Sequence, residues 1–195
     1  MSKANKSNKA IKYRLYPNDE QKVMFAKTFG CCRFVYNQLL ALQKQRYKDG
    51  ESHLSKLKSN EFATRTLKKD YDFLKEIDKF AVSNAVFHLA DAYDRFFKKQ
   101  NHFPKFKSKR KSKKSYTTNF TNNNILIGKN VIKLPKVGMV KAVIHKLPKD
   151  DWKLKSVTVS QDGVGNYFAS VLFEYEQEDI PSVSKSSTNA IGLDY

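Results

Sequence analysis

The spacing of apolar positions changes along the chain and predicts a strand, then helices, then further strands. Residues 10–15 alternate between apolar and basic side chains, with Lys12 and Arg14 sharing one face. A period of two residues is typical of a half-buried strand. Pro17 follows at once and ends it, because proline cannot donate a ladder hydrogen bond. The chain therefore opens with a short strand that has a basic face.

Helical spacing follows over about 80 residues. Asn18, with Gln21 three positions later, predicts a capping box at the start of the first helix. We expect this helix to end at Gly30, since glycine is the commonest residue after a helix C-terminus. Further helical segments are expected over about 31–47, 55–69, 71–77 and 79–99. The last has the clearest apolar stripe, which we interpret as a core-facing surface.

Beyond residue 124 the period returns to two. Apolar runs at 125–127 and 131–134 flank Gly128-Lys129-Asn130, which indicates a hairpin. A third run covers 137–145, and a second hairpin is predicted from 155–160 and 167–175. These patterns predict an α+β fold in which five or six strands form a small antiparallel sheet or β-barrel. The first strand could close it, with the helices inserted between its first and second strands.

Charge is concentrated in one part of the chain. The whole sequence has 37 Lys or Arg and 19 Asp or Glu, a net charge of +18. Residues 95–149 contain 16 of the basic residues and no acidic one, and positions 105–114 alone hold seven basic residues. A polyanion is the natural partner, because neutralised phosphates release counterions.

A basic run can also be only a solvated linker or a localisation tract. Apolar or aromatic residues flank this one, namely Phe103, Pro104, Phe106, Tyr116 and Phe120. We therefore expect the tract to be attached to a folded surface.

Several classes of protein are disfavoured. No apolar stretch approaches the roughly 18–20 residues of a membrane span, so we expect a soluble protein without a membrane partner. The polar N-terminus does not resemble a signal peptide. Cys31 and Cys32 are adjacent, a poor geometry for a disulfide or a metal site, and indicate buried thiols in a cytoplasmic protein. The four histidines are scattered, so no Cys/His metal cluster is predicted.

Nine short motifs occur in an order that resembles the N-terminal half of the TnpB (OrfB) family. These are the transposase-associated RNA-guided DNA endonucleases of bacterial insertion sequences, related to compact type V CRISPR effectors. The resemblance covers nearly the whole chain and rests on YRLYPN (13–18), FGCCRFVYNQ (29–38), DKFA (78–81), FPKFKSK (103–109), SYTTNFTNNN (115–124), IKLPKVGMVK (132–141), SVTVS (156–160), NYFASVL (166–172) and IGLDY (191–195).

The resemblance implies a wedge domain, an oligonucleotide-binding-type antiparallel β-barrel, with an inserted α-helical recognition domain. The implied division is the first wedge strand at 1–17, the helical recognition domain at 18–102, the remaining wedge barrel with the basic tract at 103–180, and a linker with the first strand of an incomplete RuvC-like nuclease domain at 181–195.

In that family this lobe holds a guide RNA and reads a short motif flanking a double-stranded DNA target. The DKFA motif then implies DNA contacts by Lys79 and Phe80, and FTNNN implies contacts by Thr121 and Asn122. Ser83 stands where relatives have Gln, so the motif that is read can differ. Nucleic-acid backbone contacts are expected from Lys12, Arg14, Lys105, Lys107, Lys109, Arg110, Lys111, Lys113, Lys114, Tyr116, Lys136 and Lys141.

IGLDY is similar to the first RuvC-like motif, which implies that Asp194 is a catalytic residue and a ligand of Mg²⁺ in the two-metal site of the complete family protein. The later acidic ligands and the zinc ribbon of the family are absent from this chain. We therefore expect a truncated form that is inactive alone. Two alternatives are a stand-alone RNA- or DNA-binding regulator without cleavage activity and a general basic protein of structured RNA.

Overall fold

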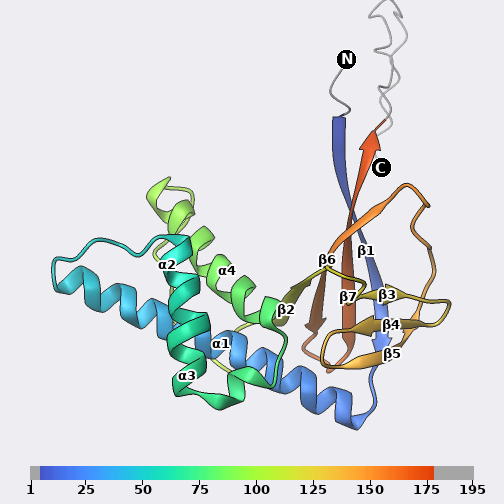
Figure 1. The fold of residues 1–195 in the computed structure, drawn as a ribbon, viewed down its shortest axis with the longest axis horizontal. Helices are drawn as coiled ribbons and strands as arrows, with labels where there is room; N and C mark the ends of the chain where they lie inside the picture. The colour runs from blue at the N-terminus through green and yellow to red at the C-terminus, as the bar shows by residue number, and fades with distance from the viewer. Residues whose placement is uncertain (1–4, 178–195) are drawn as a thin grey trace, which may run out of the picture.

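The structure, a computed structural model, describes residues 5–177 (Figure 1). The predicted linker and nuclease strand at 181–195, including Asp194, lie outside the described residues.

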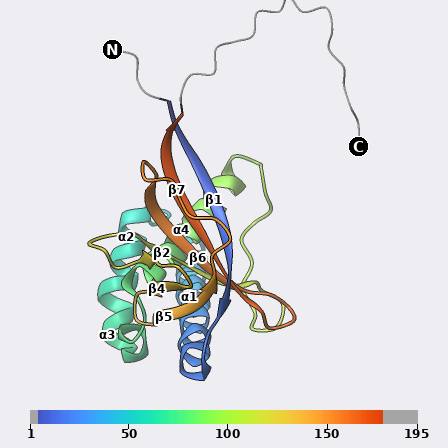
Figure 2. The same cartoon turned by 90° about the vertical axis from the view of Figure 1, so that its right-hand side faces the viewer.

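A long antiparallel pair of strands joins the two ends of the described chain. Strand β1 (Asn5–Tyr16) pairs with β7 (Tyr167–Gln177) along nearly its whole length, from Asn5 opposite Gln177 to Leu15 opposite Tyr167. Both views show the two strands side by side (Figures 1 and 2). The predicted alternation is confirmed: Tyr13 and Leu15 are buried, whereas Lys12 is exposed. The strand is longer than the apolar pattern alone indicated.

Seven antiparallel strands form one sheet in the order β2-β6-β7-β1-β5-β4-β3. The remaining strands are β2 (Lys114–Asn119), β3 (Leu126–Ile127), β4 (Val131–Leu134), β5 (Gly138–Val143) and β6 (Lys153–Gln161). Both predicted hairpins are confirmed, as β3–β4 and β6–β7. Strand β2 was not predicted, because its basic and polar residues continue the basic tract.

The prediction of a closed barrel is wrong. Strands β2 and β3 are the two edges of the sheet, and no ladder joins them within residues 5–177. One of these edge strands, β3, is only two residues long, so it offers few ladder hydrogen bonds for closing the sheet onto β2.

One continuous helix, α1 (Asp19–Lys48), replaces the two that were predicted around Gly30. Its capping box is confirmed: Asn18 Oδ1 accepts from Gln21 N at 2.8 Å, and Gln21 Oε1 accepts from Asn18 N at 3.1 Å. The predicted end at Gly30 is wrong because the same buried face continues across it, from Phe29 to Cys32. That packing offsets the cost of about 1 kcal/mol for glycine in a helix.

The other helical predictions are confirmed with small differences. Residues 56–70 form α2 (Lys56–Glu61), a π-helical turn (Phe62–Leu67) and α3 (Lys68–Asp70). A 3₁₀ turn (Asp72–Lys75) precedes α4 (Lys79–Phe97), whose apolar stripe is buried as expected. All the helices fall between β1 and β2 in the chain. None in the described part combines the length and apolarity that crossing a membrane requires.

The helices and the sheet share one hydrophobic core. Aromatic rings link them where α1 crosses the sheet. Phe25 lies 5.4 Å from Tyr167 of β7 between ring centroids, and Phe29 lies 5.9 Å from Tyr116 of β2. This packing fixes α1 against both β7 and β2, the strand beside which the candidate site lies.

Candidate nucleic-acid interface

An open hollow of about 500 Å³ lies where the start of α4 meets two turns of the sheet. We call it the basic hollow. It brings together four of the five residues expected to contact DNA: Lys79, Phe80, Thr121 and Asn122. Lys136, which was expected to contact the nucleic-acid backbone, also lines the basic hollow. Its other lining residues are Lys68, Lys75, Ile77, Asp78, Asn124 and Pro135. Segments some forty residues apart in the sequence therefore face one space.

Asp78 fixes the start of α4 against β2. Its Oδ2 accepts from Ala81 N at 3.2 Å, which caps the helix, and from Thr118 Oγ1 at 2.7 Å. One turn further on, Asn84 Nδ2 donates to Thr117 O at 3.0 Å. Asp78 is only 7% exposed, so both of its bonds are shielded from water. The first turn of α4, with Lys79 and Phe80, is thereby held at the rim of the hollow.

A tight turn presents Asn122. Thr121 N donates to Asn124 Oδ1 at 2.8 Å, and Asn124 N donates to Thr121 O at 3.0 Å. Asn122 and Asn123 have φ of 47° and 55°, the left-handed region at both central positions. Asparagine tolerates this conformation better than most residues. The exposed Asn122 amide can therefore donate and accept hydrogen bonds toward a partner.

Several ammonium groups make the hollow electropositive. Burial lowers the pKa of Lys68, and the nearby charges of Lys79 and Lys136 lower it further, against the opposing effect of Asp78. Lys136 has a φ of 65°, a left-handed conformation that is unusual for lysine. Lys75 is partly neutralised by Asp72 at 2.5 Å. The sequence pattern missed Lys68 and Lys75, because both lie on polar helical segments outside any motif.

Ser83 is not brought into this hollow. It lies one turn beyond Lys79 on α4 and is half-buried. The flanking-motif role expected of it remains a prediction.

The basic tract is attached to α1, as its flanks predicted. The side chain of Asn37, on α1, makes two hydrogen bonds to the backbone of Lys107. Its Nδ2 donates to Lys107 O at 2.9 Å, and its Oδ1 accepts from Lys107 N at 2.8 Å. Lys107 Nζ lies 4.1 Å from the centroid of the Tyr36 ring, and burial lowers its pKa. The other basic residues of the tract are exposed: Lys105, Lys109, Arg110, Lys111, Lys113 and Lys114.

Tyr116 is the exception. It was expected to contact a nucleic-acid backbone, but it is 3% exposed and packs against Phe25 and Phe29. Burial raises the pKa of its phenol strongly. Its position on the inward face of β2 makes it a core residue, so that expectation does not hold.

The outer face of β1 carries the remaining predicted contacts. Lys12 Nζ lies 4.3 Å and the Arg14 guanidinium carbon 5.0 Å from the centroid of the Phe168 ring. Arg14 also donates to Asn166. Lys141 is exposed on β5, opposite Tyr16 of β1. Lys12 and Arg14, which lie over an aromatic ring, form a second basic surface together with Lys141 on the neighbouring strand.

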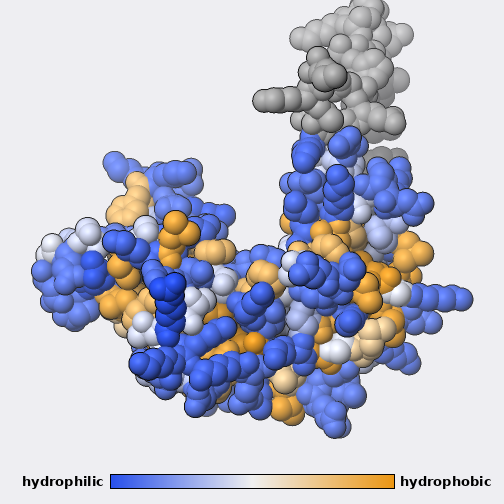
Figure 3. Space-filling model, viewed as in Figure 1, coloured by the Kyte–Doolittle hydropathy of each residue, from blue (hydrophilic) through white to orange (hydrophobic). Residues whose placement is uncertain are grey.

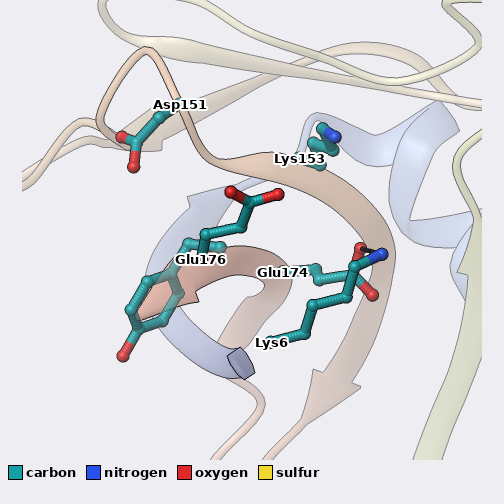
Figure 4. A pocket seen from close by; sticks show the side chains of 6 residues that line it. Lys6, Asp151, Lys153, Glu174 and Glu176 are labelled. Carbon is teal, nitrogen blue, oxygen red and sulfur yellow. Dashed lines mark hydrogen bonds and ion pairs between the residues drawn. The ribbon is translucent and has the colours of Figure 1, made fainter. Parts of the chain in front are cut away.

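Another hollow, at the β1–β7 ribbon, is lined by acidic groups that do not converge. Glu174 bonds to Lys6 at 3.4 Å and to Lys155 at 3.5 Å, while Asp151 lies on a separate loop (Figure 4). Across residues 5–177, no set of three or more His, Cys, Asp or Glu side chains is arranged to hold a metal ion.

The basic hollow and tract are typical of proteins that bind polyanions, and comparisons with known proteins identify the family. The helix-turn-helix domain model of OrfB proteins (HTH_OrfB_IS605) matches residues 5–52. In this chain that range holds β1, α1 and the residues just after it.

Curated relatives extend the match to 95% of the chain. A putative RNA-guided DNA endonuclease of Streptomyces pristinaespiralis is 30% identical over 188 residues, and the putative RNA-guided DNA endonuclease InsQ of Escherichia coli K12 is 29% identical over 192. The virulence protein VsdF of Salmonella dublin is 32% identical over 111 residues, 52% of this chain and 93% of VsdF. The chain belongs to the TnpB/OrfB family. It spans 45% and 44% of the lengths of the two endonucleases.

Proposed function

We propose that this chain binds a guide RNA and reads a short motif in double-stranded DNA, as the nucleic-acid-binding part of a TnpB-type RNA-guided endonuclease. The observation that carries the proposal is the meeting of Lys79, Phe80, Thr121 and Asn122 in one basic hollow. Both nucleic-acid partners are supported by the names of the Streptomyces pristinaespiralis and Escherichia coli relatives, which describe putative RNA-guided DNA endonucleases.

Two kinds of contact follow from the side chains present. The exposed amide of Asn122 can make a paired donor and acceptor contact with a base edge, the chemistry that distinguishes base pairs. Lys79 and Lys136 can contact a base or a phosphate. The basic tract offers ammonium and guanidinium groups that position a backbone without reading sequence. The basic hollow would therefore read the DNA sequence, and the basic tract would bind the nucleic-acid backbone.

A selection from duplex DNA with a randomised segment tests the proposal. The chain, loaded with its guide RNA, should enrich a motif of a few base pairs. Asn122→Ala should relax the preference at one or two positions, at a cost of about 1–3 kcal/mol, while leaving RNA affinity unchanged. Lys133→Ala, an exposed lysine of β4 outside the hollow, is the matched control. Equal loss on every sequence would mean that Asn122 supports only the turn, and the reading role would fall.

Mg²⁺-dependent cleavage belongs to the same proposal. Bound Mg²⁺ would activate water for phosphodiester hydrolysis. Asp194 is this chain's candidate ligand, and across residues 5–177 no three His, Cys, Asp or Glu side chains are grouped to hold a metal ion. Guide-dependent cutting by this chain fused to the remaining part of the Streptomyces pristinaespiralis endonuclease, abolished by Asp194→Ala, would support the proposal.

A second candidate is a binding protein that acts without cleavage. VsdF favours it, because 93% of that shorter protein aligns with this chain. Target binding by the same fusion, with guide RNA and Mg²⁺ present but without any cut strand, would favour this candidate.

A further inference from the structure

A separate groove lies at the end of the helical part farthest from the sheet. It has a volume of about 640 Å³ and lies between the C-terminal parts of α1 and α4 and the loop at 49–55. We call it the aromatic groove, after the six rings that line it: Tyr47, His53, Tyr93, Phe96, Phe97 and Phe103. None of these residues lines the basic hollow.

Three of these rings are unusually open to solvent. Tyr47 is 85% exposed, Phe97 64% and Phe103 40%. Large aromatic side chains normally contribute their area to a core, so a cluster that stays open marks an interaction site. Figure 3 shows hydrophobic residues reaching the surface of the helical part among hydrophilic ones.

Hydrogen bonds and ring packing hold the lining of the aromatic groove in place. Gln43, only 5% exposed, holds the loop by donating from Nε2 to Leu54 O at 3.2 Å and accepting from Leu54 N at 3.0 Å. This places the His53 ring 4.6 Å from Tyr93 between centroids. Phe103 stands nearly perpendicular to Tyr93 at 5.6 Å. The floor is therefore ordered before any ligand arrives.

Lysine side chains beside the aromatic groove indicate a negatively charged ligand. Lys44 Nζ lies 5.5 Å from the centroid of Phe103 and 4.9 Å from that of Phe106, and Lys48 lines the groove beside it. The acid in the lining, Glu51, is paired with Arg46. Phe103 also begins the segment that continues into the basic tract. Flat apolar rings beside a run of cations match a polymer of flat bases and phosphates.

We propose that the aromatic groove binds unpaired bases of a single-stranded nucleic acid, whose phosphates continue along Lys44, Lys48 and the start of the basic tract. Bases would stack on the exposed rings of Tyr47 and Phe97. Duplex DNA cannot enter in this way, because its bases are already stacked and paired. The proposal rests on nucleic-acid binding as proposed above, but not on the basic hollow or on a flanking motif.

The test uses a single-stranded oligonucleotide carrying 2-aminopurine, whose fluorescence falls on stacking, and a blunt duplex of the same length. The full chain should quench the single strand. The double variant Tyr47→Ala/Phe97→Ala should bind it at least about tenfold more weakly, because it lacks two of the rings on which bases would stack. Duplex affinity should stay within about twofold of wild type. The control is Leu57→Ala/Val164→Ala, which truncates two side chains outside the aromatic groove that are 81% and 88% exposed. It should change neither single-strand nor duplex affinity.

The possible results separate the two proposals. Unchanged single-strand affinity in the Tyr47/Phe97 variant, or an equal loss on strand and duplex, overturns base stacking in the groove but leaves the basic hollow standing. Failure of the wild-type chain to bind either nucleic acid overturns both. If the variant instead turns a dimer into a monomer in sedimentation without changing quenching, a second copy of the chain occupies the groove and the proposal falls.

Discussion

The hydroxyl of Thr118 donates a hydrogen bond of 2.7 Å to the carboxylate of Asp78, and both residues are buried. The same carboxylate oxygen caps α4 by accepting from Ala81 N. One side chain therefore joins a helix start to a sheet edge that is forty positions away. The geometry of the basic hollow depends on this junction, because Lys79 follows Asp78 directly and Thr121 lies just beyond the end of β2.

Asp78→Ala should destabilise the protein by about 2–4 kcal/mol. It removes a helix cap, which costs about 0.5–2 kcal/mol, and leaves a buried hydroxyl without its partner, which costs about 1–3 kcal/mol. Urea unfolding monitored by circular dichroism measures this change. Asp72→Ala is the control, because its ion pair with Lys75 is exposed to water and should contribute little to stability. Similar losses for the two variants would contradict the role given to Asp78.

Gly30→Ala should stabilise the protein by about 0.5–1 kcal/mol. Gly30 lies inside α1, its φ is not positive, and a Cβ built there meets no atom within 4 Å. Alanine then gains helix propensity at no steric cost. Gly138→Ala is the opposite case, since its φ of 82° strains any side chain. That variant should lose more than about 1 kcal/mol. A loss of stability in Gly30→Ala would mean that α1 needs a flexible point there.

Local pattern predicted most elements of this fold but not how they close. Periods of two and 3.6 residues identified β1, both hairpins and α4, because these periods follow from burying one face of each element. Closure depends instead on pairing between the two edge strands, β2 and β3, and no ladder joins them within residues 5–177. Strand β2 was missed for a related reason: its alternation is short and starts inside a run of lysines.

For the candidate site too, the sequence predicted individual residues but not their arrangement in space. Motifs identified Lys79 and Asn122 separately, yet nothing local said that they face one hollow. Their meeting depends on the bond between Asp78 and Thr118. Lys68 had no local signal, because it enters the hollow from a polar helical segment that the fold brings alongside.

Replacing five exposed tract residues with Gln should weaken binding to all nucleic acids about equally. The changes are Lys109, Arg110, Lys111, Lys113 and Lys114. If the intact chain neutralises about 5–8 phosphates, its log–log salt slope should be roughly −4 to −7, and the variant's slope should be shallower by about 0.9 for each phosphate that it no longer neutralises. Fluorescence anisotropy over a salt series measures both slopes.

Lys22→Gln/Lys27→Gln is the matched control, because both lysines already pair with acids on the protein surface. It should shift the slope little. A slope near zero for wild type, or a sequence-dependent loss in the tract variant, would contradict the assignment of the tract to backbone binding.

Stability should fall as the pH rises above about 9, partly because of Cys32. Burial raises the pKa of this thiol from 9.0 to about 12. Below about pH 9 the folded and unfolded chains hold the proton alike. Between about 9 and 12 the unfolded chain loses it while the folded chain keeps it, so the free energy of unfolding decreases with rising pH. The Cys32 contribution is at most about 1.4 kcal/mol per pH unit. Cys32→Ala should therefore give a shallower decline between pH 8.5 and roughly 10.5 in urea unfolding, whatever its effect at pH 7. The buried phenol of Tyr116 acts in the same direction, so some decline should remain. A decline as steep as that of wild type would show that Cys32 ionises in the folded protein as easily as in the unfolded chain.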